Sequence, residues 1–136
     1  MSSLNEEVSV PIKSASDIVV ARQKGRALAI HMGFAGSDPT VIAAAISEVA
    51  RNIVNHAQHG EIILLGIHEG GRLGIQVNAI DHGPGISDID RAMQYGYSSS
   101  KGMGVGLPGA KWLMDEFEIQ SQIGKGTKVT MRKWVR

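Results

Sequence analysis

The glycine-rich segment at residues 98–109 carries the strongest chemical signal in the chain. It reads SSSKGMGVGLPG, and an amphipathic stretch, AKWLMDEF, follows at residues 110–117. Gly102, Gly104 and Gly106 stand at every second position, so backbone N–H groups can approach an anion without a Cβ in the way. A helix that starts here adds the positive end of its dipole. The segment predicts a phosphate-binding loop; the alternative is a flexible glycine loop without chemical function.

Two other phosphate motifs do not fit this segment. Residues 104–109 match the dinucleotide pattern G-x-G-x-x-G, but no predicted strand leads into them. No acidic residue ends the following strand near Ile123, as that pattern would require. The Walker pattern G-x-x-x-x-G-K-[ST] occurs nowhere in the chain. We therefore expect neither a Rossmann nor a P-loop nucleotide site.

A predicted long helix carries a carboxylate and two carboxamides beside its apolar face. At about 100° per residue, Glu48, Asn52 and Asn55 fall on one narrow arc. The neighbouring apolar face should be buried, and it consists of Ile42, Ile46, Val49 and Ile53. Because buried carboxylates are unfavourable unless paired, the arc suggests Asn52 as a Mg²⁺ ligand and Glu48 as a base beside metal-bound phosphates. The alternative is a solvated helix side on which Glu48 pairs with Arg51 or Asn52.

A third group, DHGPGI, follows a predicted strand at residues 81–86. The carboxylate of Asp81 at the strand end can accept a hydrogen bond from an exocyclic amine. Gly83 and Gly85 allow the chain to turn close under a flat ring. The alternative is an ordinary strand-to-helix turn, because Asp, Gly and Pro are common turn residues.

Composition excludes several classes of function. The 136 residues include 14 Lys or Arg and 13 Asp or Glu, with a formal net charge of +1 and no cysteine. No basic stripe alternates with aromatic residues, so we expect no nucleic-acid partner. The densest apolar run, residues 62–67, is far shorter than the roughly 20 residues that span a bilayer, so we expect no membrane partner. We expect one domain over residues 1–136, located in the cytoplasm.

The elements that must position these groups follow from periodicity and turn residues. Gly33 and Gly60 are expected to end the two long helices. We expect strands at 8–12, 61–68, 72–80, 117–123 and 127–135, and helices at 16–31, 38–58, 87–95 and 108–116. Hairpins at residues 69–71 and 124–126, with helices between, predict an α+β fold: a two-layer α/β sandwich with a mixed, mostly antiparallel sheet and helices on one face.

The order of these motifs resembles the GHKL ATP-binding family of gyrase, Hsp90, histidine kinase and MutL type, over nearly the whole chain. Residues 48–52 resemble its N box, 81–85 its G1 box, 102–106 its G2 box and 124–127 its final glycine-threonine box. The resemblance implies the Bergerat fold and ATP with Mg²⁺ as cofactors.

Within that family, the chain is most similar to the small serine/threonine kinases related to anti-sigma factors, and among these to the kinase of the stressosome. Ser47 precedes Glu48, where histidine kinases usually carry His or Asn. The lid between Tyr97 and Gly102 is very short. The stretch GMGVGLPGAKWLMDEF, residues 102–117, is close to the pattern of this branch.

The resemblance assigns a role to each candidate site residue. Glu48 would be the catalytic general base, and Asn52 the Mg²⁺ ligand. Asp81 would bind the adenine amine, with Thr127 helping to close the pocket. The remaining nucleotide-binding residues would be Gly83, Gly85 and Ile86 around the adenine, and Lys101, Gly102, Met103, Gly104, Val105, Gly106 and Leu107 around the phosphates.

The resemblance also implies the activity and the partners. The ATP γ-phosphoryl group would pass to STAS-domain proteins of the stressosome (RsbS and RsbR type), and the freed kinase would activate a PP2C-type phosphatase. Two alternatives stay open: an anti-sigma-type binding module, which needs no base at Glu48, and a detached histidine-kinase ATPase domain. A partner-sensing role for Arg22 and a site role for His56 are also open, and a solvated or structural role is the alternative for each.

Overall fold

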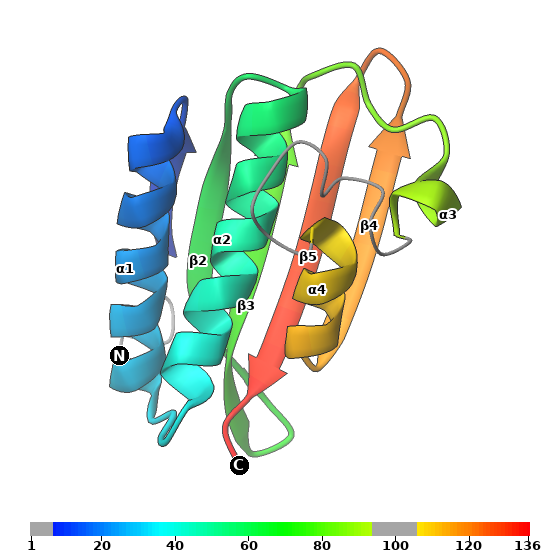
Figure 1. The fold of residues 1–136 in the computed structure, drawn as a ribbon. Coiled ribbons are helices and arrows are strands. Elements are labelled where there is room, and N and C mark those ends of the chain that lie inside the picture. The colour runs from blue at the N-terminus through cyan, green and yellow to red at the C-terminus, as the bar shows by residue number, and fades with distance from the viewer. Residues whose placement is uncertain (1–6, 94–105) are drawn as a thin grey trace.

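One five-stranded sheet, covered on one face by helices, forms the frame of the computed structural model in Figure 1. The structure describes residues 7–93 and 106–136. The elements are β1 (Glu7–Ile12), α1 (Ala15–Met32), α2 (Asp38–His56), β2 (Gly60–Glu69), β3 (Arg72–Asp81), α3 (Ile89–Ala92), α4 (Gly106–Leu113), β4 (Glu116–Gln122) and β5 (Gly126–Trp134). The expected α+β two-layer sandwich is confirmed. No helix within the described ranges has the length and apolar character needed to cross a membrane.

The sheet has the strand order β1-β2-β3-β5-β4, and each pairing among the described strands is antiparallel. The prediction of a mixed sheet is wrong in this detail. β3 and β4 run in the same direction, since each is antiparallel to β5, but β5 lies between them. A parallel pair would need β4 to lie directly beside β3.

The helix α2 presents its predicted apolar face to the sheet. The four residues of that face are at most 2% exposed: Ile42, Ile46, Val49 and Ile53. α2 also packs beside α1 in the same layer, where a Cβ added to Gly25 would collide with Cδ1 of Ile46. Gly25 thus allows the two helices to approach closely, and α2 lies between α1 and α4 (Figure 1).

The ends of the two long helices agree with the prediction to different degrees. Gly33 ends α1, as expected, and the structure shows it in the left-handed conformation at φ 102°. The helix α2 ends at His56 rather than at residue 58, and Gly60 does not cap it. Gly60 instead begins β2 opposite Asp81, so pairing in the sheet determines its conformation.

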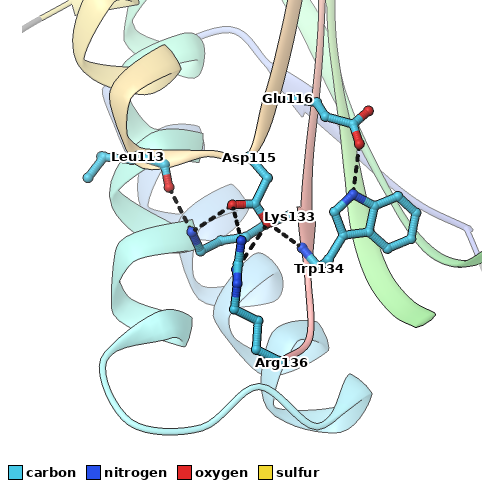
Figure 2. Close-up of polar contacts among 6 residues, drawn as sticks. All are labelled: Leu113, Asp115, Glu116, Lys133, Trp134 and Arg136. Atoms are coloured by element: carbon cyan, nitrogen blue, oxygen red, sulfur yellow. Dashed lines mark hydrogen bonds and ion pairs between the residues drawn. The ribbon is translucent and has the colours of Figure 1, made fainter.

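The helix α4 is displaced toward the N-terminus relative to the prediction, which placed it at 108–116. Pro108 lies in its first turn, where a missing N–H removes no intrahelical bond. The helix ends at Leu113 because the next two acidic residues bond to β5: the Asp115 carboxylate accepts from the backbone N–H of Trp134 at 2.8 Å, and Glu116 accepts from the indole N–H of Trp134 at 2.7 Å (Figure 2).

The helix α3 covers only residues 89–92 of the predicted 87–95. The Asp88 carboxylate accepts from the backbone N–H of Arg91 and caps this short helix at its start. Residues 94 and 95 lie outside the described part of the chain.

Candidate functional site

The carboxylate of Glu48 accepts two hydrogen bonds, one on each oxygen. Oε2 accepts from Nη1 of Arg51 and Oε1 from the backbone N–H of Gly106, both at 3.0 Å. The side chain of Glu48 is 13% exposed. The contact with Arg51 is the pairing that the sequence left open, whereas the contact with Gly106 was not predicted. It brings a negative charge to the N-terminus of α4, where the helix dipole favours an anion.

Asn52 lies one turn beyond Glu48 on α2 and is half-buried. Its side chain makes no hydrogen bond to another residue of the described segments. It lines a cavity of about 170 Å³ whose other walls are His56, Pro84, Gly85, Ile86, Ser87, Asp88, Ala92 and Leu107. The amide oxygen of Asn52 is therefore available to a ligand in this cavity. Asn55, the third polar residue of the arc, is exposed.

Asp81 ends β3 as a buried carboxylate, 6% exposed. Its Oδ1 accepts from the backbone N–H of Gly83 at 2.9 Å and from that of Thr127 at 3.2 Å. These bonds fix the side chain from two directions and use one oxygen. The second oxygen, Oδ2, retains the capacity to accept from a ligand amine.

Ser121 of β4 is a further candidate site residue, which the sequence alone did not indicate. Its hydroxyl accepts from the backbone N–H of Ile86 at 2.7 Å and lies 2.8 Å from the hydroxyl of Thr127. It thereby links the segment after β3 to the final hairpin. The predicted hairpin turn at 124–126 was the usable signal, because it pairs Ser121 with Thr127 across the two strands.

The candidate residues do not all line one hollow. Gly85, Ile86 and Leu107 share the cavity with Asn52. Asp81 and Thr127 line a second depression of about 330 Å³, and the hydrogen bond from Ile86 to Ser121 joins the two, because Ile86 lines the first and Ser121 the second. Gly85 has φ +81°, a left-handed conformation that favours glycine at this junction.

Glu48 lines a third hollow, a groove of about 380 Å³ between α1 and α2. The other groove residues are Arg22, Gln23, Arg26, Thr40, Ala43, Ala44 and Ser47. Glu48 therefore lies between this groove and the start of α4. The predicted phosphate-binding residues Lys101, Gly102, Met103, Gly104 and Val105 lie outside the described residues.

The opposite end of α4 is anchored to β5 by charged groups (Figure 2). Nζ of Lys133 donates to the backbone oxygen of Leu113 at 3.1 Å and lies 3.7 Å from Asp115. Burial alone would raise the pKa of Asp115, but hydrogen bonds from the backbone N–H of Trp134 and from Arg136, with the charge of Lys133, hold it below its ordinary value. This anchor leaves the N-terminus of α4 as the end nearer to the candidate site.

The described side chains offer few ligands for a metal ion. No group of three or more His, Cys, Asp or Glu side chains gathers anywhere in residues 7–93 and 106–136. A divalent cation at Asn52 would depend on one amide oxygen together with oxygens of its own ligand and water. Mg²⁺ bound together with nucleotide phosphates is coordinated in this way.

Comparisons with known proteins agree with this geometry. Residues 37–136 match the family described as histidine kinase-, DNA gyrase B-, and HSP90-like ATPase. The chain is 45% identical over 133 residues to the serine/threonine-protein kinase RsbT of Bacillus subtilis (strain 168), covering 98% of this chain and 100% of RsbT. It is 35% identical over 109 residues to the anti-sigma F factor of Thermoanaerobacter sp. (strain X514), covering 72% of this chain and 75% of that protein.

A solved structure has the same fold. The crystal structure of the RsbU and RsbW domains of a Mycobacterium tuberculosis protein superposes with a TM-score of 0.65 at 21% sequence identity. The match covers 95% of this chain but 32% of that one, so the present chain spans about a third of its length. The resemblance to serine/threonine kinases related to anti-sigma factors is confirmed by these relatives. The chain therefore belongs to the histidine kinase-, DNA gyrase B- and HSP90-like family of ATP-binding domains.

Proposed function

We propose that this chain is a cytoplasmic serine/threonine protein kinase that binds ATP with Mg²⁺ between α2, the segment after β3 and the start of α4. One domain over residues 1–136 would hold all parts of this site. The observation that carries the proposal is the contact between Glu48 and the N–H of Gly106. It puts a carboxylate that can act as a base next to the helix start that would receive the phosphates.

The adenine end of the site rests on Asp81. A buried carboxylate with one oxygen already engaged by two N–H groups is rigid, and its other oxygen would accept from the adenine amine. Gly83, Gly85 and Ile86 would shape the pocket around the ring, and Thr127 would help to close it. The Ser121 hydroxyl supports this arrangement, because it holds Ile86 and Thr127 together.

The phosphate end rests on Asn52 and α4. Asn52 would hold Mg²⁺ through its amide oxygen, and bound Mg²⁺ would neutralise part of the triphosphate charge. Direct contacts to the phosphates would come from Lys101 and the backbone N–H groups of Gly102, Met103, Gly104, Val105, Gly106 and Leu107. Asn52 supports this assignment, because its side chain lines the cavity and makes no hydrogen bond to another residue of the described part of the chain.

The transfer step needs one base. The acceptor hydroxyl oxygen would attack the γ-phosphorus while the bond from that phosphorus to the β–γ bridging oxygen breaks and ADP leaves. The hydroxyl proton would pass to Glu48. Positioning and charge neutralisation supply most of the catalysis in such reactions, so this small set of groups is sufficient.

The groove between α1 and α2 provides a route for the acceptor. It is lined by Glu48 of α2 and by Arg22 and Arg26, two exposed residues of α1. Two arginines in the wall of this groove favour an acceptor protein with acidic residues near its hydroxyl. This location supports the partner-sensing role of Arg22 that sequence resemblance suggested.

By relationship to RsbT, the acceptors we propose are STAS-domain proteins of the stressosome, of the RsbS and RsbR type. After their phosphorylation the released kinase would bind and activate a PP2C-type phosphatase. The similarity to a protein named anti-sigma F factor supports such a switch between partners.

A binding module that uses nucleotide only to set its shape is the second candidate, and the anti-sigma relatives favour it. Such a module does not need Glu48 as a base. The variant Glu48→Gln separates the two, because the amide oxygen can still accept from Gly106 but cannot take a proton at neutral pH.

The test compares wild type, Glu48→Gln and Glu118→Gln with a STAS-domain protein and γ-labelled ATP. Glu118 is an exposed carboxylate of β4 outside the site and serves as the matched control. We expect Glu48→Gln to bind ATP within about two-fold of wild type and to lose transfer by about 10²-fold to 10⁴-fold. Acid-stable phosphate on Ser or Thr supports the kinase; acid-labile phosphate would indicate a histidine-kinase activity. Unchanged transfer by Glu48→Gln would exclude Glu48 as the base.

A further inference from the structure

Nucleotide binding would affect the two hydrogen bonds of Glu48 differently: the bond from Gly106 would be lost, and the bond from Arg51 would remain. Gly106 belongs to the loop and helix start that would bind phosphate, and a phosphate oxygen would compete with Oε1 of Glu48 for its N–H. Arg51 lies on α2 itself, three residues after Glu48, and its bond to Oε2 does not depend on α4. Of the two partners that Glu48 has among residues 7–93 and 106–136, Arg51 is therefore the one that can hold the carboxylate through nucleotide binding.

The environment of the pair distinguishes it from an ordinary surface ion pair. The side chain of Glu48 is 13% exposed and that of Arg51 is 30% exposed. Among the described residues, Glu48 is the sole hydrogen-bond partner of the Arg51 guanidinium. On α2, Arg51 lies one turn beyond Ser47, which lines the groove beside Glu48. Arg51 is not among the residues that line this groove, so its bond to Oε2 leaves the groove itself open to an acceptor.

From this geometry we infer that Arg51 is a positioning residue for the transfer reaction: it holds Oε2 of Glu48 so that Oε1 faces the acceptor hydroxyl after the phosphates have taken the N–H of Gly106. The inference rests on the proposed role of Glu48. Arg51 touches neither nucleotide nor acceptor in this scheme. Its removal should therefore reduce the rate of transfer and leave ATP affinity unchanged.

The experiment uses the whole chain, a STAS-domain acceptor and the variants Arg51→Ala, Arg51→Lys and Arg136→Ala. The last is the matched control, because Arg136 also pairs with a carboxylate, Asp115, at 3.1 Å, but at the opposite end of α4. We expect Arg51→Ala to lower kcat by about 10-fold to 100-fold, with KM and Kd for ATP within about two-fold of wild type. Arg51→Lys should lower kcat by a smaller factor than Arg51→Ala, since an ammonium group at this position can still reach the carboxylate. Arg136→Ala should keep the wild-type kcat.

Chemical rescue separates positioning from a general structural role. Guanidinium at low millimolar concentration should restore part of the kcat of Arg51→Ala, and potassium chloride at the same ionic strength should not. Wild-type kcat in Arg51→Ala, or a loss that Arg51→Lys and guanidinium both fail to relieve, would overturn the inference. A raised KM and Kd for ATP at wild-type kcat would overturn it too, by assigning Arg51 to the nucleotide.

The results that would refute the proposed function differ from those that would refute the inference about Arg51. If wild type transfers no phosphate, or if Glu48→Gln transfers as fast as wild type, the base itself is wrongly assigned. If wild type transfers, Glu48→Gln does not, and Arg51→Ala matches wild type, the inference about Arg51 alone is refuted.

Discussion

Asp81 at the end of β3 accepts a hydrogen bond from the backbone N–H of Thr127, 46 positions later in the chain, at 3.2 Å. A second bond, from the N–H of Gly83, reaches the same oxygen at 2.9 Å. The carboxylate is thus oriented by the β3–β5 pairing and by the turn that follows β3. This rigid orientation is what a specific acceptor for a base amine requires.

The variant Asp81→Asn tests that assignment. The amide oxygen can still accept from Gly83 and Thr127, so the fold should persist, but the amide nitrogen would point a donor at the adenine amine. We expect ATP affinity to fall by about 10-fold to 100-fold in isothermal titration calorimetry. The preference for ATP over GTP should also shrink, because an amide can donate to the guanine carbonyl.

Two measurements make this prediction decisive. The thermal midpoint of Asp81→Asn should stay close to that of wild type, and Glu118→Gln should bind ATP normally as an exposed carboxylate control. ATP affinity that is unchanged in Asp81→Asn would remove Asp81 from the nucleotide site.

The contact between α1 and α2 predicts a coupling between Gly25 and Ile46. In an exposed helix, Gly→Ala adds about 1 kcal/mol of stability. Here the new methyl would meet Cδ1 of the fully buried Ile46, and overpacking of a core costs about 1–3 kcal/mol. We expect Gly25→Ala to lower the free energy of unfolding, and Ile46→Val, which removes Cδ1, to restore part of the loss in the double variant.

Urea denaturation of the four proteins in this cycle measures the coupling. Ala27→Gly, at an exposed position of the same helix, measures the difference in helix propensity between alanine and glycine without a change in core packing. Strictly additive effects of Gly25→Ala and Ile46→Val would contradict a direct contact between the two positions.

The anchor at the base of α4 predicts a dependence of stability on pH. The pKa of Asp115 is held below its ordinary value of 3.8: burial raises it, and the hydrogen bonds from Trp134 and Arg136 outweigh that effect. The pKa of Glu116 lies below its ordinary value of 4.5, because its carboxylate accepts hydrogen bonds from the indole N–H of Trp134 and, with a smaller effect, from Arg132. A carboxylate whose pKa is lowered by folding stabilises the folded state at pH values above its unfolded-state pKa. This stabilisation is lost as the pH falls through the folded-state pKa.

We therefore expect the free energy of unfolding to fall as the pH drops below about 4.5, and this slope to flatten in the double variant Asp115→Asn, Glu116→Gln. The contribution of Glu116 to this pH dependence should become smaller at high salt, because its side chain is 45% exposed. Denaturation curves between pH 6 and pH 3 provide the measurement, with Glu118→Gln on the same strand as control. A slope that is identical in wild type and the double variant would contradict the prediction.

Much of the fold was determined by local sequence. The apolar stripe of α2, the end of α1 at Gly33 and the two glycine hairpins reflect backbone preferences and burial within a few residues. They were predicted correctly because neighbouring residues alone decide them. The order of the polar motifs along the chain likewise pointed to the family without coordinates.

Tertiary structure decided the rest. The insertion of β5 between β3 and β4 made the sheet antiparallel throughout, since the order of strands across a sheet is not encoded in their order along the chain. Trp134 of β5 ended α4 at Leu113 by bonding Asp115 and Glu116. The contact of Glu48 with Gly106 spans 58 positions, and that of Ser121 with Ile86 spans 35. Such hydrogen bonds depend on how helices and strands pack against one another, and a local pattern of residues does not determine that packing.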